Sequence, residues 1–98
     1  MANRSFTKES EKLTEAKLVK FVKEHGGKAI KLLSDYDNGL PDRLLLFPEG
    51  IAVFVETKSE GEKPRKLQLI RHKELRALGF TVLVIDKAEQ IDQLKELI

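Results

Sequence analysis

The sequence has no cysteine among its 98 residues. It can therefore form neither a disulfide framework nor a thiolate metal site, and this absence is typical of proteins in a reducing compartment. Apolar runs extend to about five residues, whereas a helix that crosses a bilayer needs ~20. The first residues, MANRSFTKESEK, lack the apolar region of a signal peptide. We therefore expect a cytoplasmic protein with no membrane segment.

The chain also has little net charge. Its 18 Lys and Arg residues nearly balance its 16 Asp and Glu residues, which leaves a formal charge of +2. Basic residues nevertheless outnumber acidic residues by seven to three between Lys58 and Arg76. This segment is either a surface for a polyanion or a solvated helix face, and charge alone does not decide between them.

The sequence does have enough apolar content to fold. Hydrophobic residues make up 41% and charged residues 35% of the chain, which is typical of a globular protein. A length of 98 residues suits one domain with a single core, so we expect residues 1–98 to form one domain.

The spacing of the apolar residues predicts the element order α-β-β-β-α-β-α. This order indicates the α/β class, with a mixed four-stranded sheet flanked by helices. The expected helices cover residues 7–25, residues 65–78 and a final segment that opens with a capping box at Asp86 and Glu89; the expected strands cover residues 28–34, 43–47, 51–58 and 80–85.

Apolar stripes predict the inner faces of the last two helices. In the helix 65–78, the residues expected to face inward include Leu67, Ile70 and Leu78. The final helix has a wider stripe at the chain end, which either packs on the core or forms a contact between two copies. Its members are Ile91, Leu94, Leu97 and Ile98.

A carboxylate and an amine follow the apolar run of the third strand. Glu56 and Lys58 project from one face of that strand, ~7 Å apart along the chain. A hairpin turn at PEG pairs Phe47 with Ile51, and this register places Asp42 beside Glu56 at the end of the sheet. An isolated Glu-x-Lys is more simply an ion pair at a strand end, with Asp42 an ordinary turn residue.

A third acid, Glu15, comes from the first helix. It shares the packed stripe of that helix with Leu18 and Val22, so we expect it to face the same cluster. Carboxylates that gather at the edge of a core need a cation to neutralise them. Hard oxygen ligands with no cysteine or histidine nearby favour Mg²⁺ or Mn²⁺ over zinc. The pattern therefore predicts a metal-dependent site that cleaves phosphodiesters, with the lysine acting on phosphate or water.

Two short motifs resemble those of a nuclease superfamily. Pro41–Asp42 and Glu56–Lys58 resemble the paired motifs of the PD-(D/E)xK nucleases. More narrowly, GLPDR, ETKSEG and LQLIRHKELRALG resemble the virus-type replication-repair nuclease (VRR-NUC) family, over residues 15–86. The resemblance implies a restriction-endonuclease-like core similar to that of Holliday-junction resolvases, and a single VRR-NUC-type domain over residues 1–98.

The resemblance also implies roles for individual residues. One or two Mg²⁺ or Mn²⁺ ions are expected at the site. The implied metal ligands are Asp42, Glu56, Glu15 and the backbone carbonyl of Thr57. The implied catalytic residues are Lys58, Glu56, Asp42, Glu15 and Gln68. Gln68 would face the site at the start of the second core helix, although it is alternatively an exposed helix residue.

Nucleic-acid contacts are expected on the basic segment and the helix that follows it. The expected contact residues are Lys63, Arg65, Lys66, Arg71 and His72. His72 shares a helix face with Gln68 and is expected either to touch phosphate or to be simply solvated.

The function implied is that of a Mg²⁺-dependent, structure-specific DNA endonuclease that acts on branched DNA such as Holliday junctions. A homodimer, a helicase or repair partner, and the cytoplasm of a bacterial or phage-infected cell are expected with it. The alternatives are a catalytically silent or partner-dependent DNA-binding module with the same fold, and a nuclease that acts on RNA.

Overall fold

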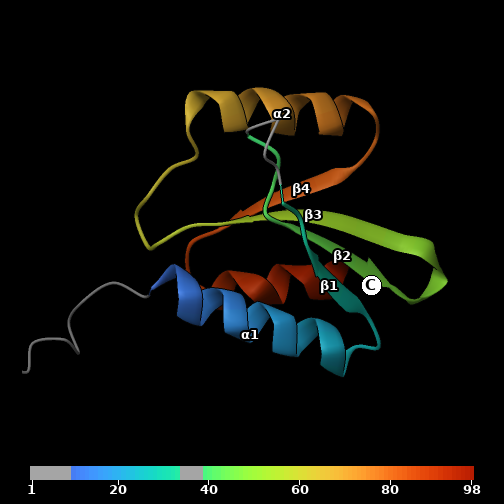
Figure 1. The fold of residues 1–98 in the computed structure, drawn as a ribbon. Helices are drawn as coiled ribbons and strands as arrows, with labels where there is room; N and C mark the ends of the chain where they lie inside the picture. Colours follow the sequence, from blue (N-terminus) through green and yellow to red (C-terminus); the bar gives the residue numbers. More distant parts are fainter. Residues whose placement is uncertain (1–9, 34–38) are drawn as a thin grey trace, which may run out of the picture.

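The computed structural model describes residues 10–33 and 39–98, and has the predicted order of elements (Figure 1). The helices are α1 (Glu11–Glu24) and α2 (Lys66–Ala77), and two 3₁₀ helices follow the strands β2 and β4: η2 (Pro48–Gly50) and η3 (Ala88–Glu96). The strands are β1 (Lys28–Lys31), β2 (Arg43–Phe47), β3 (Ile51–Thr57) and β4 (Thr81–Ile85). The parts of the predicted first helix and first strand at residues 7–9 and 34 lie outside the described residues.

The four strands form one mixed sheet in the order β1-β2-β3-β4. Strands β1, β2 and β3 pair antiparallel, and β4 pairs parallel to β3. A parallel pair needs a crossover connection, and α2 provides it. Phe47 pairs with Ile51, as expected for a hairpin that turns at PEG, so the predicted register of β2 and β3 is confirmed.

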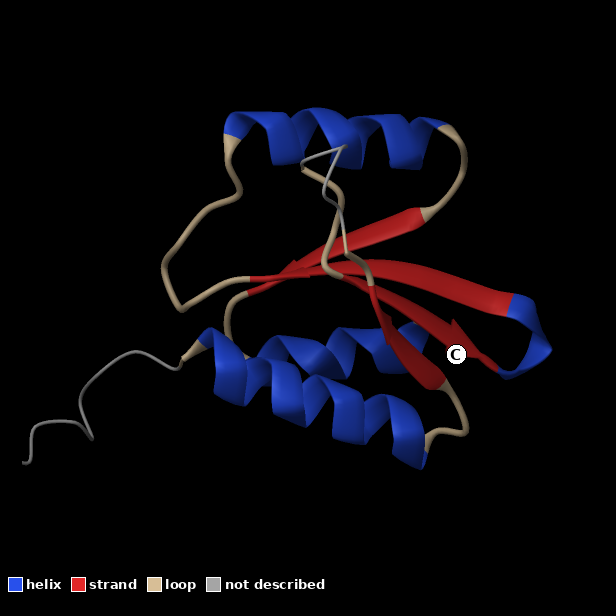
Figure 2. Ribbon diagram, viewed as in Figure 1, coloured by secondary structure: helices blue, strands red, loops and turns tan. Residues whose placement is uncertain are grey.

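Helices cover both faces of the sheet (Figure 2). Helix α1 and η3 pack on one face, and α2 lies over the other (Figure 1). The main core lies on the α1 side, because alternate residues of β2 and β3 point there. Its fully or nearly fully buried members are Leu18, Val22, Leu45, Phe47, Val53, Val55, Ile85, Ile91 and Leu94.

The last element is a 3₁₀ helix rather than the predicted α-helix. Ile91 and Leu94 are buried and Leu97 packs beside them, and this spacing of three matches the 3.0 residues per turn of a 3₁₀ helix. These residues therefore pack on the core of their own chain, while Ile98 remains 41% exposed. The predicted capping box is wrong, since Gln90 Oε1 accepts the N–H groups of Asp86 and Lys87 instead.

Helix α2 buries a polar face, contrary to the prediction. Leu67, Ile70 and Leu78 are 40%, 44% and 74% exposed, whereas Gln68 and His72 are the buried residues of the helix. Polar side chains are seldom buried without partners. The partner on the sheet is Glu56, so the orientation of α2 is tied to the predicted site.

None of the helices in the described ranges is long and apolar enough to cross a bilayer.

Candidate active site

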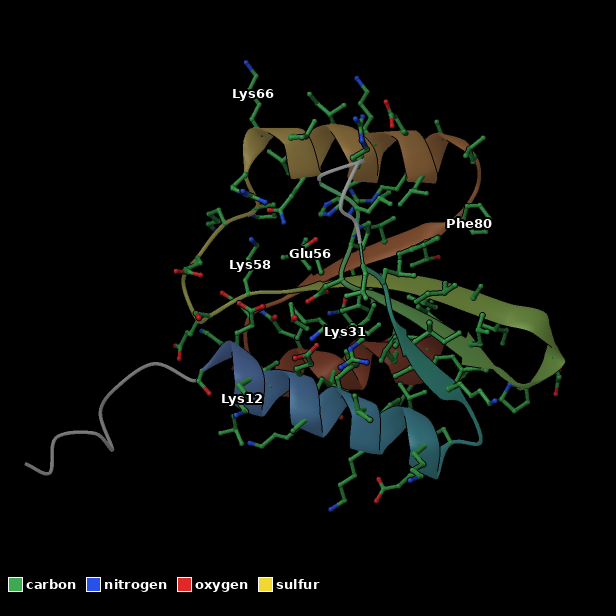
Figure 3. The ribbon with its side chains drawn as sticks, viewed as in Figure 1. Lys12, Lys31, Glu56, Lys58, Lys66 and Phe80 are labelled. Atoms are coloured by element: carbon green, nitrogen blue, oxygen red, sulfur yellow. The ribbon has the colours of Figure 1, made fainter. Side chains whose placement is uncertain are left out.

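Segments that are distant in the sequence meet at one end of the sheet. Asp42 directly precedes β2, while Glu56 and Thr57 end β3. Because Arg43 pairs with Val55, Asp42 lies level with Glu56 on the neighbouring strand. Glu56 and Lys58 point from the sheet into the space below α2 (Figure 3). The structure thus brings together the acidic and basic residues of the two motifs.

Asp42 is fixed by hydrogen bonds from Thr57. The Thr57 N–H donates to Asp42 Oδ1 at 3.0 Å, and the Thr57 hydroxyl donates to Oδ2. Burial raises the pKa of the Asp42 carboxyl above its ordinary value, and the bonds from Thr57 partly oppose that rise. The sequence suggested only the carbonyl of Thr57 as a ligand and missed this contact. The predicted register of β2 and β3 carried the signal, because it places Asp42 level with Glu56 and therefore next to Thr57.

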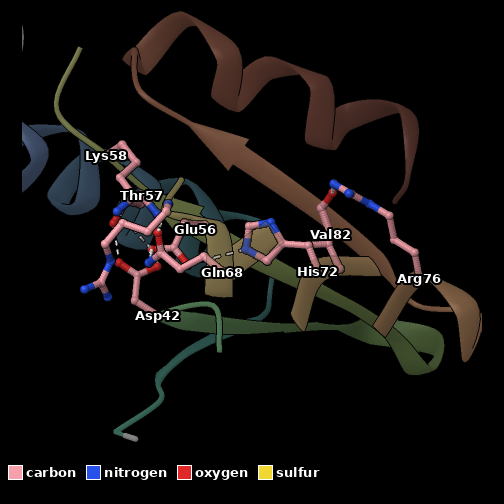
Figure 4. Close-up of polar contacts among 9 residues, drawn as sticks. Asp42, Glu56, Thr57, Lys58, Gln68, His72, Arg76 and Val82 are labelled. Carbon is pink, nitrogen blue, oxygen red and sulfur yellow. Dashed lines mark hydrogen bonds and ion pairs between the residues drawn. The ribbon is translucent and has the colours of Figure 1, made fainter. Parts of the chain in front are cut away.

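Glu56 is a buried carboxylate with unequal partners on its two oxygens. Gln68 Nε2 donates to Oε2 at 2.9 Å, and Lys58 Nζ lies 3.9 Å from the same oxygen (Figure 4). His72 Nε2 lies 3.6 Å from the other oxygen, Oε1. Burial raises the pKa of Glu56 to about 7, and the charge of Asp42 adds to the rise while Lys58 opposes it. A nearby cation would stabilise the charged form of this buried carboxylate.

Gln68 joins the start of α2 to the end of β3. Its Oε1 accepts the N–H of Arg65 at 2.8 Å, which caps the first turn of α2, while its Nε2 donates to Glu56. Only 5% of Gln68 is exposed, so its placement as an exposed helix residue is wrong. Both ends of the amide are used, so a single side chain fixes the helix relative to the carboxylate.

Glu15 is neutralised by arginine instead of joining Glu56. Arg43 Nε and Nη2 each lie 3.0 Å from Glu15 Oε2, and Arg43 Nη1 also donates to the carbonyl of Ala29 at 3.2 Å. Arg43 shares the sheet face of Leu45, on the α1 side, whereas Glu56 faces α2. Glu15 therefore lies on the other side of the sheet from Glu56, although its charge still raises the pKa of Asp42. Among residues 10–33 and 39–98, no group of three or more Asp, Glu, His or Cys residues is arranged to hold a metal ion.

Arg43 was not among the predicted site residues, although it directly follows the Pro-Asp motif. Its place on the inward face of β2 could have been read from the alternation with Leu45 and Phe47. A half-buried arginine at that position gains from a nearby acid, and α1 supplies it with Glu15.

Another acid of α1, Glu11, lies one turn earlier and shares the electric field of the site. Burial raises the pKa of Glu11, the charge of Asp42 raises it further, and Lys58 opposes the rise. Glu11 in turn contributes to the raised pKa of Glu56. Two acids of α1 thus act electrostatically on the site: Glu11 raises the pKa of Glu56, and Glu15 raises the pKa of Asp42.

The loop between β3 and α2 is fastened to the end of β4. The N–H of Lys58 donates to the carbonyl of Ile85 at 2.9 Å, and the N–H of Gly61 donates to Asp86 Oδ2 at 2.9 Å. The hydrogen bond from Gly61 lowers the pKa of the Asp86 carboxyl. These contacts hold the position of Lys58 and of the basic residues that follow it.

The predicted nucleic-acid contacts divide into three kinds of position. Lys63 and Arg65 are exposed on the loop beside the site, and the charge of Arg65 reaches Glu56. Lys66 is also exposed, but it points away from Glu56 and Lys58 (Figure 3). Arg71 pairs with Glu74, with 3.2 Å between Nη1 and Oε1. Arg65 is therefore the expected contact residue whose charge is shown to act on the acidic cluster.

His72 is not solvated, contrary to the prediction. Its side chain is 1% exposed and lies beside Glu56, toward which it points from α2 (Figure 4). It therefore presents no surface to a phosphate in this structure.

Comparisons with known proteins agree with these observations. No family model matches the chain. A protein described as "Putative nuclease p44", from Acyrthosiphon pisum secondary endosymbiont phage 1, is 45% identical over 75 residues, which cover 76% of this chain and 81% of that protein. A solved structure described as "VRR_NUC domain" has a TM-score of 0.81 and 31% sequence identity, and the match covers 90% of this chain and 97% of that chain. The fold, the paired motifs and these relatives together place the chain in the VRR-NUC family of nucleases.

Proposed function

We propose that this nuclease is a divalent-metal-dependent DNA endonuclease in which Asp42, Glu56 and Lys58 form the catalytic centre. The observation that carries the proposal is the position of Glu56. This buried carboxylate lies beside Asp42, 3.9 Å from the Lys58 amine, and is held by Gln68 from α2. Buried acids with raised pKa values beside a lysine are typical of catalytic sites rather than of surface ion pairs.

The residues present fit a hard cation. Asp42 and Glu56 offer carboxylate oxygens, which are the ligands that Mg²⁺ and Mn²⁺ prefer. Burial and the repulsion between the two acids destabilise their charged forms, so a bound cation would stabilise both carboxylates. Glu56 Oε1 accepts no hydrogen bond from any described residue. Asp42 and Glu56, with the carbonyl of Thr57, would hold one or two Mg²⁺ or Mn²⁺ ions. The structure gives less support to Glu15 as a direct metal ligand, because its carboxylate already forms an ion pair with Arg43. When bound, such an ion polarises the scissile phosphate and lowers the pKa of a coordinated water.

Lys58 would act on the reacting group itself. Its side chain is only 15% exposed, and its Nζ lies 3.9 Å from Glu56 Oε2, so the amine faces the site. An amine at this position neutralises charge that develops on the phosphate or accepts a proton from the attacking water. Gln68 would keep Glu56 in place during the reaction, and Thr57 would do the same for Asp42.

The proposed substrate is branched DNA. A basic loop beside one small site gives contacts to phosphate, and it offers little surface for reading base edges. Two symmetric cuts in a junction need two copies of the site, so we propose a two-fold homodimer as the active species. We also propose that residues 1–98 work as a single nuclease domain, in the cytoplasm of a bacterial or phage-infected cell, where a helicase or repair partner would present the DNA.

A panel of substrates tests the proposal. The purified protein is incubated with Mg²⁺, Mn²⁺ or EDTA and with junction, flap, nicked and linear DNA, and with the matching RNA. We expect cleavage of junctions with either metal and none in EDTA. Cleavage that needs an added protein partner would favour the partner-dependent module, and equal cleavage of RNA would contradict the choice of DNA.

A further inference from the structure

His72 is the second residue of α2 that faces Glu56. It lies one turn after Gln68, and residues spaced by four share a helix face. Gln68 donates to Glu56 Oε2 at 2.9 Å, and His72 Nε2 lies 3.6 Å from Oε1. The two oxygens of the carboxylate therefore face two different side chains of one helix (Figure 4).

The contact between His72 and Glu56 is longer than a hydrogen bond. Within the part of the chain that the structure describes, neither ring nitrogen of His72 has a hydrogen-bond partner, and Glu56 Oε1 has none either. Buried donors and acceptors are nearly always paired, so three unpaired atoms side by side require an explanation. The separation exceeds a hydrogen bond by about 0.7 Å, and catalytic hydrogen bonds are often long in the free enzyme and shorten in the working complex.

We propose that His72 is a positioning residue, whose imidazole donates its Nε2–H to Glu56 Oε1 and so fixes the carboxylate plane together with Gln68. This inference rests on the proposed function of Glu56 as a ligand and deepens it. With one donor on each oxygen, the carboxylate cannot rotate about its last bond, and its remaining lone pairs keep a constant direction toward Asp42. Partners of this kind orient metal ligands in many sites.

A neutral ring is sufficient for this role, because one of its nitrogens carries an N–H that can donate to Glu56. Burial lowers the pKa of His72, and the charges of Arg76 and Lys58 lower it further. Arg76 is itself held in place, because its Nη2 donates to the carbonyl of Val82 at 2.7 Å. A neutral imidazole has a single N–H, so a donor at Nε2 leaves Nδ1 without a proton.

Two substitutions separate positioning from packing. His72→Leu fills similar space without a donor, whereas His72→Gln keeps an N–H near the position of Nε2. Leu69→Gln is the matched control, because Leu69 lies on the same helix and is 53% exposed. Melting in EDTA, Mn²⁺ binding by calorimetry, and kcat and KM on junction DNA are measured for each variant and for the wild type.

We expect His72→Leu to weaken Mn²⁺ binding and to lower kcat by about 10- to 100-fold, with little change in the KM for DNA. His72→Gln should recover most of both losses, and Leu69→Gln should match the wild type. A purely structural histidine predicts the opposite pattern, with lower melting temperatures in EDTA and normal Mn²⁺ binding and kcat in the folded fraction. That result, or equal losses in the Leu and Gln variants, would overturn the inference.

A direct measurement remains decisive if His72→Leu fails to fold. Nitrogen NMR of the imidazole in the wild type, above the pKa of Glu56, should show the proton on Nε2, and its shift should change in Glu56→Gln. A proton on Nδ1, or no response to Glu56→Gln, would overturn the inference. Failure of the wild type to bind Mn²⁺ would instead refute the proposed function, because the tautomer reports the contact between His72 and Glu56 without metal.

Discussion

Glu56 has the most strongly altered environment of the residues at the site. The fold buries it beside Asp42, and its pKa rises from 4.5 to about 7. The folded protein therefore binds a proton at Glu56 more tightly than the unfolded chain does. By linkage, the free energy of unfolding of the metal-free protein should fall as pH rises from about 4.5 to 7, by an amount on the order of 2 kcal/mol from this group.

The comparison of wild type with Glu56→Gln isolates this effect. His72 acts in the opposite direction, because its lowered pKa makes stability fall as pH decreases, so the wild-type profile alone is ambiguous. Glu56→Gln cannot titrate, and we expect it to gain stability over the wild type as pH rises through that window. Denaturant unfolding in EDTA at several pH values measures the difference. A constant difference across the window would contradict the raised pKa.

Lys58 and Asp42 should fail in different ways when substituted. We expect Lys58→Ala to keep the fold and metal binding but to lose cleavage by several hundredfold or more, on the order of 3–4 kcal/mol of transition-state stabilisation. Asp42→Asn should lose both metal binding and cleavage, because a ligand is removed. Calorimetry with Mn²⁺ beside a cleavage assay distinguishes the two, and full activity of either variant would refute the assigned roles.

At the scale of elements, most of the fold follows from local patterns. The hairpin between β2 and β3 is set by the PEG turn and by alternation, so the position of Asp42 beside Glu56 was predictable. The orientation of α2 was not predictable from periodicity. That method assigns apolar residues to the inner face, whereas α2 turns Gln68 and His72 inward because Glu56 is buried opposite them.

The ion pair between Glu15 and Arg43 marks a second limit of the sequence. Helical spacing correctly placed Glu15 on the packed side of α1, but it gave no information on which charge lies opposite. Only the pairing of β1 and β2 brings Arg43 and Ala29 together under α1. The contacts of Arg43 join side chains and backbone from α1, β1 and β2. They depend on the assembled fold, so the apolar pattern of one element cannot predict them.

Gly39 links the segment that carries Asp42 to the start of α2. Its φ is +96°, and a Cβ there would come within 2.9 Å of the carbonyl oxygen of Leu67. We expect Gly39→Ala to lower stability by more than the 1–2 kcal/mol or so that a left-handed φ alone costs, and to lower kcat because Asp42 moves.

Gly79→Ala is the matched control for this substitution. Gly79 has nearly the same φ, +98°, but none of the described atoms lies within 4 Å of its added Cβ. Thermal melts and cleavage rates of the two variants are compared with those of the wild type. Equal destabilisation, with normal kcat in both, would contradict a packing role for Gly39.

At the scale of the whole molecule, the site lies at one end of the sheet, with α1 and η3 on one side and α2 on the other (Figure 1). The loop from β3 to α2 borders this end and carries the exposed Lys63 and Arg65. The charge of Arg65 reaches Glu56, while Lys66 points away from Glu56 and Lys58 (Figure 3). DNA that reaches the acids should therefore contact Lys63 and Arg65 first. Its affinity should depend on salt, because phosphate contacts release counterions.

Salt dependence of binding tests this placement of the DNA. In EDTA, we expect Lys63→Ala and Arg65→Ala each to weaken junction binding and to reduce the slope of log K against log salt by about one. Lys66→Ala should change the slope less, and all three effects should be independent of DNA sequence. Wild-type affinity and slope in the variant lacking both Lys63 and Arg65 would mean that DNA binds elsewhere.

The most direct test of the proposed catalytic centre is cleavage of a mobile four-way junction and of a linear duplex by the wild type and by Lys58→Ala, each in Mg²⁺ and in EDTA. We predict that the wild type cuts the junction faster than the duplex in Mg²⁺, that EDTA abolishes cutting, and that Lys58→Ala binds the junction but does not cut it. Junction cleavage that persists in EDTA or in Lys58→Ala would contradict a metal-dependent centre built on Asp42, Glu56 and Lys58.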